Sequence, residues 1–366
     1  MFRRSTILIF TTCLVLASSV QGRSFDMFQP GYEGCYDRAK ESYTFVVDAH
    51  NHFRPFGGEE VPFEAMLGYL QKMEIFFVNI YGIGQKLPPD SPCTYYLDCP
   101  GVPVTPSLSN DFVNADNIAT RLPDKLPKDM HLTLAMTFPD LAEPEEIEGK
   151  MVLLDREYPG MFTWMGEINM VKQAIFPNHY EAVPIEAISR WKRFMDMLER
   201  RKMPISFHSD IGNSSNPTKY LPLMKTILRL YPRNTIVWHH MGLSKELPDM
   251  NPNDHIATMK QLLDANQNLY LDISWRVIYD NYFSKPRIRS LYVTFLNDYH
   301  DRILPGTDFV ASIKKTFDVY KKEVELTSDI QKDLNNEAFR AIALGGNYFK
   351  IMQLPYIAPK ICGAEE

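Results

Sequence analysis

Short β-type runs alternate with helical patterns along most of the chain, and this alternation constrains the fold more than any other feature. Runs such as 75–80 and 131–138 are apolar and flanked by turn-forming residues, as expected of buried strands. In the segment 185–198, apolar residues recur about every 3.6 residues behind Pro184, which indicates an amphipathic helix. Strands that alternate with helices form βαβ units and hence a parallel sheet.

Eight such units close naturally as an α/β fold of the (β/α)8, or TIM, barrel type. The strands are expected at 45–48, 75–80, 131–138, 163–170, 204–208, 235–239, 269–273 and 302–304. The helices are expected at 62–73, 144–157, 185–198, 221–230, 256–263 and 330–344. An open doubly wound sheet is the alternative, but it would usually carry a Gly-rich nucleotide loop after its first strand, and the sequence has none there.

The segment 82–128, after the second expected strand, is too long for a simple connection. It contains eight prolines and two cysteines. Connections longer than about 15 residues are usually functional lids or binding loops. We therefore expect an insertion after strand 2 that lies over the mouth of the barrel.

Residues 1–22 have the composition of a secretory signal peptide. Two arginines precede an apolar run, 7–17, which is too short to span a membrane. Val20 and Gly22 suit the −3 and −1 positions of a signal-peptidase site, with cleavage after Ser19 as the rival and an uncleaved anchor as the alternative. The protein is therefore expected to be secreted or periplasmic.

Export would place the cysteines in an oxidising compartment, where an even number of them suggests disulfides. Four cysteines follow the signal segment: Cys35, Cys93, Cys99 and Cys362. Cys93 and Cys99 are close in sequence and are expected to pair. That leaves Cys35 with Cys362, near the two ends of the folded part, which often lie close together. Four free thiols are the alternative.

The charge of the chain argues against one class of partner. The formal net charge is −6 and no basic block occurs, so a nucleic-acid-binding surface has no electrostatic support. No membrane association is expected after signal removal. The expected partner is a small-molecule substrate, and a homo-oligomer is left open. Residues 23–44 are interpreted as an irregular lead-in, and 45–366 as the barrel.

Metal-binding side chains follow the ends of four expected strands. His50 and His52 come after the first strand, and residues two apart in extended backbone point the same way, so both imidazoles can reach one metal ion. The ends of the fifth, sixth and eighth strands supply His208, His239, His240 and Asp308. Barrel enzymes build their sites at this rim.

These motifs resemble the metal site of the amidohydrolase superfamily. The matching stretches are Asp48-Ala49-His50-Asn51-His52, His208, His240-Met241-Gly242 and Gly306-Thr307-Asp308. Gly345-Gly346-Asn347 also resembles the C-terminal signature of the branch that includes aminocarboxymuconate-semialdehyde decarboxylase. The resemblance covers about residues 45–350 and implies a metal-dependent (β/α)8 barrel.

The resemblance implies roles for individual residues. His50, His52 and His208 would be metal ligands, and Asp308 would be both ligand and base. His240 would be the strand-6 histidine, because it stands directly before the Met-Gly pair. Its neighbour, His239, should point to the opposite side of the strand and pack against a helix.

Glu167, in the fourth expected strand, is a further candidate ligand. A buried carboxylate there would be costly unless it is paired or bound to metal. Lys172 is the alternative partner. If Glu167 binds metal, the site holds two ions, as in many superfamily members, whereas the decarboxylase-like branch uses one.

The ligand set suits Zn²⁺, with Mn²⁺ and Fe²⁺ as alternatives. The ion would lower the pKa of a bound water to about 7. Asp308 could accept the proton of that water, and His240 could bind the oxygen on which charge develops. The implied activity is hydrolysis of a small amide, ester or lactone. Non-oxidative decarboxylation of a small carboxylic acid at the same site is the alternative.

Other residues are expected to surround the metal. Arg54 could bind a substrate carboxylate, with a surface salt bridge as the alternative. Asn169 shares the face of Glu167 and, like Trp275, is expected to contact substrate. Asp272, at the end of the seventh strand, could orient a ligand or cap the next helix, whereas His255 is expected to be solvated.

Overall fold

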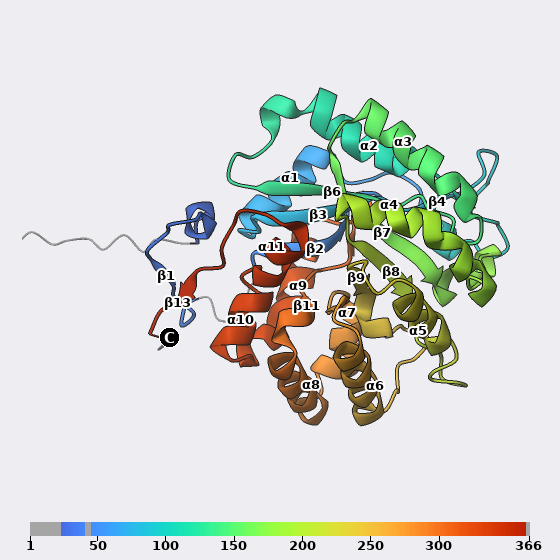
Figure 1. Ribbon diagram of the computed structural model, residues 1–366. Helices are drawn as coiled ribbons and strands as arrows, with labels where there is room; N and C mark the ends of the chain where they lie inside the picture. Colours follow the sequence, from blue (N-terminus) through green and yellow to red (C-terminus); the bar gives the residue numbers. More distant parts are fainter. Residues whose placement is uncertain (1–22, 41–44, 364–366) are drawn as a thin grey trace, which may run out of the picture.

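The computed structural model describes residues 23–40 and 45–363, so the expected signal segment, 1–22, lies outside the described residues. Nine strand segments form one parallel sheet in the centre of the molecule (Figure 1). In sheet order they are β11 (Ile303–Leu304), β10 (Leu269–Asp272), β9 (Ile236–Trp238), β8 (Ile205–Ser209), β7 (Phe162–Val171), β6 (His131–Met136), β3 (Phe77–Tyr81), β2 (Val47–His52) and β12 (Phe309–Val310).

The two edges of this sheet meet, because β11 and β12 are halves of one interrupted strand. β11 pairs with β10 and β12 pairs with β2. Between the halves, the Ala49 backbone nitrogen donates to the Pro305 carbonyl at 3.2 Å, and that of Asp308 donates to the His50 carbonyl at 2.8 Å. A Cβ on Gly306 would lie 2.9 Å from the His50 Cβ, so this close approach requires glycine. The predicted (β/α)8 barrel is confirmed.

Helices surround the barrel (Figure 1). Their buried apolar residues pack into the hydrophobic core. The helices are α1 (Phe63–Lys72), α2 (Ser109–Asp116), α3 (Ile147–Glu157), α4 (Lys192–Arg201), α5 (Leu221–Leu230), α6 (Pro252–Ala265), α7 (Arg276–Ile278), α8 (Pro286–Asp298), α9 (Phe317–Ser328), α10 (Asn336–Ile342) and α11 (Gly346–Met352).

Two expected helices differ from those observed. The first turns of the helix expected over 185–198 are a 3-10 segment, Ile185–Trp191, which leads into α4. The helix expected over 330–344 is broken, because Asn335 caps a new helix there: its side chain accepts a hydrogen bond from the Ala338 backbone nitrogen at 2.7 Å.

The insertion between β3 and β6 has structure of its own. It contains the antiparallel pair β4 (Gln85–Lys86) and β5 (Thr105–Pro106), followed by α2. A separate apolar cluster lies beneath it, made of Phe56, Ile83, Tyr96, Ile175 and Val310. Cys93 is disulfide-bonded to Cys99, as predicted. The insertion therefore packs against Phe56 and Ile175, which follow β2 and β7, and against Val310 of β12, at the carboxyl end of the barrel.

The two ends of the described chain meet at the other end of the barrel. β1 (Cys35–Tyr36) pairs in parallel with β13 (Lys360–Ile361), on the side of the molecule away from β4 (Figure 1). Cys35 and Cys362 form the second predicted disulfide. Within the described ranges, no helix combines the length and the apolar character needed to cross a membrane.

Candidate metal centre

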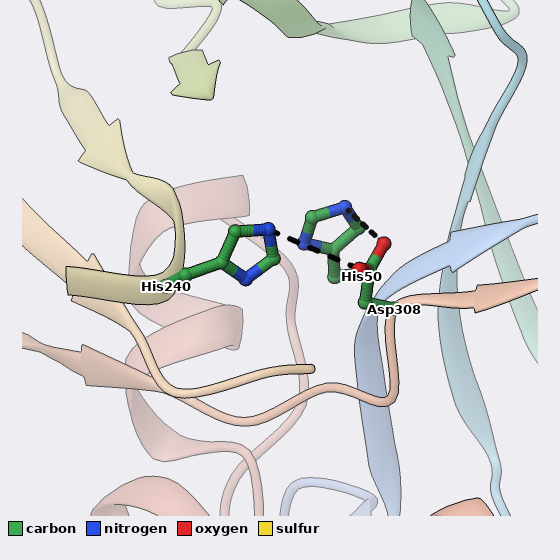
Figure 2. Close-up of side chains that lie close together, drawn as sticks. All are labelled: His50, His240 and Asp308. Carbon is green, nitrogen blue, oxygen red and sulfur yellow. Dashed lines mark ion pairs between the residues drawn. The ribbon is translucent and has the colours of Figure 1, made fainter. Parts of the chain in front are cut away.

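Three predicted site residues meet where the barrel strands end. His50 lies on β2, His240 on the turn after β9, and Asp308 on the segment that joins β11 to β12. Figure 2 shows both imidazoles directed toward the Asp308 carboxylate. His50 and His240 are buried, whereas 13% of the Asp308 side chain is exposed. The carboxylate is therefore the member of this group that a small molecule can reach.

The Nε2 atoms of the two histidines of β2 face one another. His50 Nδ1 donates a hydrogen bond to Asp272 Oδ2 at 3.0 Å, and His52 Nδ1 donates to the Gly82 carbonyl oxygen at 2.6 Å. A neutral imidazole has one ring proton, so these hydrogen bonds leave a lone pair on each Nε2 atom. The two Nε2 atoms are 3.1 Å apart. Two facing lone pairs at this distance call for a positive charge between them, either a proton or a metal ion.

Two carboxylates complete the donor set around this position. Asp308 Oδ1 is 3.3 Å from the Nε2 atoms of both His50 and His52. Glu167 Oε2 is 3.2 Å from His52 Nε2. Ligands that each lie about 2.0–2.2 Å from one ion are roughly 3–3.5 Å from one another. The donors therefore fit a single divalent ion in both chemistry and spacing.

The electrostatics of the same group favour a positive charge. Burial alone would lower the pKa of His52, but hydrogen bonding to Asp308 and Glu167 raises that pKa to about 9. Burial would raise the pKa of Asp308, but the imidazoles of His50 and His52 hold it well below its ordinary value. Nitrogen and carboxylate donors of this kind suit Zn²⁺, Mn²⁺ or Fe²⁺.

Asp272, at the end of β10, orients several of these groups. Its Oδ2 atom accepts from His50 Nδ1 and from His239 Nδ1, both at 3.0 Å. Its Oδ1 atom accepts from the His240 backbone nitrogen at 3.1 Å and from the Ser274 hydroxyl at 2.6 Å. Burial would raise the pKa of Asp272, but His239 and His50 hold it well below the ordinary value. Asp272 therefore orients His50 and the turn that carries His240, as its predicted role of orienting a ligand would require.

His239 does not pack against a helix, which corrects the prediction from strand alternation. β9 ends at Trp238, and the next residues form a 3-10 turn in which His240 and Met241 have φ values of 57° and 53°. Alternation applies only while the backbone is extended, so His239 can also turn inward. Its ring centroid is 4.0 Å from that of His50.

His240 presents its free nitrogen toward Asp308. Its Nδ1 atom lies 3.3 Å from the Ser274 carbonyl oxygen, to which it can donate. Its Nε2 atom has no hydrogen-bond partner among the described residues and lies 3.9 Å from Asp308 Oδ2. Burial lowers the pKa of His240 to about 3. His240 is therefore a neutral imidazole whose Nε2 lone pair is available.

Glu167 connects the first group of donors to a second cluster. Its Oε1 atom is 2.5 Å from His208 Nδ1, and Lys172 Nζ lies 3.2 and 3.3 Å from its two oxygens. Burial would raise the pKa of Glu167, but Lys172 and His208 hold it well below its ordinary value. Glu167 therefore lies next to Lys172, its predicted ion-pair partner, and next to His52 and His208, two of the predicted metal ligands.

His208 has a carboxylate at each ring nitrogen. Besides the Glu167 contact at Nδ1, its Nε2 atom is 3.1 Å from Asp210 Oδ1. Burial and Lys172 would lower the pKa of His208, but Glu167 and Asp210 raise it. His208 thus belongs to a second cluster, which it forms with Glu167, Lys172 and Asp210. His50 and His52 form the first cluster with Asp308.

A cavity of about 360 Å³ opens onto both clusters, with Asp308, His208 and Lys172 in its wall. Trp275 also lines it, with its ring centroid 4.9 Å from that of His240. The position of Trp275 fits the predicted substrate contact. Tyr95, from the insertion, also lines the cavity.

Two of the predicted substrate contacts are already engaged with protein groups. Arg54 forms an ion pair with Glu60 and donates from Nε to Asn110 Oδ1 at 3.1 Å, so the salt bridge expected as the alternative is present. Asn169 donates from Nδ2 to Gln85 Oε1 at 2.8 Å, while its Oδ1 has no hydrogen-bond partner among the described residues.

The expectation that His255 is solvated is wrong. This residue is fully buried on α6, where its Nε2 donates to the Met241 carbonyl at 2.9 Å and its Nδ1 accepts from the Tyr292 hydroxyl at 2.8 Å. Its place on a helix face, rather than in a loop, explains the error. His255 thereby supports the turn that carries the neighbouring His240.

Sequence reasoning missed two residues that hold the imidazoles in place. Asp210 binds His208, and Ser274 lies 3.2 Å through its Oγ from His240 Nδ1. Each follows a site residue at a spacing of two: Asp210 follows His208, and Ser274 follows Asp272. Residues two apart in extended backbone point the same way, as argued above for His50 and His52, and the same reasoning would have identified both residues.

Comparison with known proteins agrees with this geometry. A family model described as amidohydrolase matches residues 169–344. No curated protein matches the chain. Among solved structures, an amidohydrolase from Burkholderia multivorans with bound zinc is 12% identical, with 85% of this chain and 100% of that chain covered and a TM-score of 0.50. A dihydroorotase from Campylobacter jejuni is 14% identical, with 85% and 84% covered and a TM-score of 0.48.

At these identities, the likeness to solved structures concerns the fold alone. The family match covers the segment that begins at β7 and ends just after α10, and so includes His208, His240 and Asp308. His50 and His52 lie before the matched segment and complete the donor set in space. The matched segment, residues 169–344, is therefore similar to the amidohydrolase family, and it carries three of the predicted site residues.

Proposed function

We propose that this protein is an exported hydrolase that uses a divalent metal ion, most simply Zn²⁺, to cleave a small amide, ester or lactone. The observation that carries the proposal is the pair of facing Nε2 lone pairs of His50 and His52, 3.1 Å apart, with Asp308 beside them at the cavity. These donors can hold a metal ion beside a carboxylate that the cavity exposes, and this arrangement suits the activation of a water molecule.

The chain's own residues then handle the proton. His50, His52 and Asp308 would hold a divalent ion, with Glu167 adjacent, and such an ion would act as a Lewis acid that lowers the pKa of a water molecule to about 7. Asp308 is kept ionised by the imidazoles around it, so it can accept the proton of that water and later deliver it to the leaving nitrogen or oxygen. His240 can accept a hydrogen bond at Nε2 and thereby orient the water or the substrate.

The cavity supports a small substrate. Its volume of about 360 Å³ lies at the lower end of the usual range for ligand sites. Trp275, Tyr95 and Leu97 supply apolar wall, and charged side chains such as Lys172 and Arg276 line the cavity together with Asp308. Such a wall suits a compact polar molecule.

Export is supported by two separate features. The composition of residues 1–22 is that of a signal peptide, and the four remaining cysteines form two disulfide pairs in the structure. Disulfides persist in secreted and periplasmic proteins. Sequencing the N-terminus of the exported protein tests this part of the proposal, with a mature chain that begins at residue 23 as the expected result.

The activity is tested with purified protein of known metal content. A panel of amides, esters, lactones and aromatic acids is assayed before and after chelation, and then after Zn²⁺ is added back. We expect turnover that is lost with the metal and regained with it, and ¹⁸O from labelled water in the product. Turnover that is insensitive to chelation would contradict the proposal. Release of carbon dioxide without ¹⁸O incorporation would assign the decarboxylase activity instead.

A further inference from the structure

We infer that the ammonium group of Lys172 takes the place of a second metal ion, so that this centre binds one ion only. The inference rests on the proposed function and specifies the number of ions and a group that faces the substrate. Lys172 directly follows β7, and its side chain is 9% exposed. A lysine buried to this extent requires a specific partner.

The fold also brings together ligand atoms that could hold a second ion. Glu167, His208 and His240 bring one ligand atom each within 4.8 Å of one another, and all three residues are buried. Glu167 also belongs to the corresponding group formed with His50 and His52. A carboxylate shared by two such groups is what a centre with two ions about 3.5–4 Å apart requires.

Contacts within the protein already fill this second position. Lys172 Nζ lies 3.2 and 3.3 Å from the two oxygens of Glu167, and 3.4 Å from His208 Nδ1. His208 is also occupied, because its two nitrogens lie 2.5 Å from Glu167 and 3.1 Å from Asp210. A second ion would have to displace the ammonium and break these contacts.

The surroundings of Lys172 suit an ammonium group. Its Nζ lies 5.2 Å from the centroid of the Phe56 ring, which adds a cation–π contact to the ion pair with Glu167. Phe56 is itself held in the apolar cluster beneath the insertion. The position therefore provides a carboxylate on one side and an aromatic ring on another.

Lys172 also faces the substrate side of the centre. It lines the cavity together with Asp308 and Trp275. An ammonium has three N–H donors, and Glu167 does not engage all of them. The remaining donor can bind a substrate oxygen on which negative charge develops, a role that a second ion would otherwise serve.

The number of bound ions tests the inference directly. Wild type, Lys172→Met, Lys172→Arg and Lys245→Met are saturated with Zn²⁺, desalted and measured by mass spectrometry of the metal. Lys245 also lines the cavity but is exposed, so it is the matched control. We expect one ion per chain in all of these except Lys172→Met, which should bind two. With the substrate found above, Lys172→Met should also lose about 10²- to 10³-fold in kcat, and Lys172→Arg less.

Each other result is decisive. Two ions in the wild type would overturn the inference and leave the proposed function intact, whereas no ion in the wild type would contradict the proposed function itself. One ion in both wild type and Lys172→Met would overturn the inference, because something other than Lys172 would then exclude the second ion. If Lys172→Met does not fold, anomalous scattering from wild-type crystals soaked in Zn²⁺ decides: one peak beside His50 and His52 supports the inference, and a second peak beside His208 overturns it.

Discussion

The carboxylate of Asp48 accepts two hydrogen bonds from Thr307, one from its backbone nitrogen at 2.9 Å and one from its hydroxyl at 2.7 Å. Asn51 Nδ2 and the Tyr320 hydroxyl donate to the same carboxylate at 2.8 and 3.2 Å. Asp48 lies on β2, and Thr307 lies on the segment that closes the barrel. These contacts hold the neighbouring Asp308 against the strand that carries the histidines.

Replacing Thr307 by Val tests how much this closure contributes to stability. The substitution keeps the shape of the side chain but removes a buried donor to a carboxylate. We expect the free energy of unfolding, measured in urea, to fall by about 1.5–3 kcal/mol. The control is Thr163→Val, an exposed position on β7, where the change should stay within about 0.5 kcal/mol. Equal effects at the two sites would show that the Asp48 contact adds nothing.

Asp308→Asn separates metal binding from proton transfer. An amide oxygen can still face His50 and His52, but it cannot accept a proton at neutral pH. We expect a folded protein that retains metal and loses about 10²- to 10⁴-fold in kcat. Asp301→Asn, at an exposed position, serves as the control. Activity close to that of the wild type in Asp308→Asn would remove Asp308 from the mechanism.

The two disulfides should differ in their effect on stability, because they close loops of very different length. Cys35 and Cys362 are separated by 327 residues, and Cys93 and Cys99 by 6. The loop-entropy relation gives about 6 kcal/mol for the long loop and about 2 kcal/mol for the short one. Thermal unfolding of the two double-Ser variants should therefore show the larger loss for Cys35/Cys362.

The short disulfide should instead affect substrate binding, because Tyr95 and Leu97 lie between its cysteines and line the cavity. We expect the Cys93/Cys99 double-Ser variant to fold and to show a changed KM. Both thiols free in exported wild-type protein, as measured by mass spectrometry, would contradict this account.

His255 should make the protein less stable in mild acid. Burial lowers the pKa of this residue to about 4, whereas an unfolded chain has the ordinary value of 6.5. The unfolded state therefore binds a proton first as the pH falls, so stability that is fully present above pH 6.5 is lost progressively down to about pH 4. The loss attributable to this group is about 3 kcal/mol.

His255→Gln is the matched variant, since Gln keeps a donor and an acceptor but does not titrate. Urea unfolding of both proteins between pH 4 and pH 7 isolates the histidine, because the other titrating groups are shared. The stability of the wild type relative to the variant should decline as the pH falls. A difference that does not change with pH would rule out the buried neutral histidine.

Periodicity along the sequence was sufficient to predict the barrel and the positions of several site residues. Alternating strands and helices can be recognised locally, and carboxyl ends of parallel strands meet at one rim. The spacing of two between His50 and His52 then places both imidazoles on one face, and the structure brings them together with Asp308.

Features that depend on tertiary contacts could not be predicted in this way. The inward turn of His239 follows from the early end of β9, and the ion pair of Arg54 depends on where Glu60 lies. Lys172 was recognised only as a partner for Glu167, because its position relative to His208 is set by neighbouring strands of the barrel.

The bond between Cys35 and Cys362 makes the chain between them a covalent ring. A protease that cuts one loop of this ring, such as the insertion around β4, releases no fragment: the molecule keeps its mass until it is reduced, and then separates into two pieces. The insertion can therefore be nicked while its two flanks, β3 and β6, remain tethered through the far end of the barrel. In the exported hydrolase proposed above, a protease cut in the insertion would therefore change the structure only locally, at the mouth of the barrel, and no part of the chain would be lost.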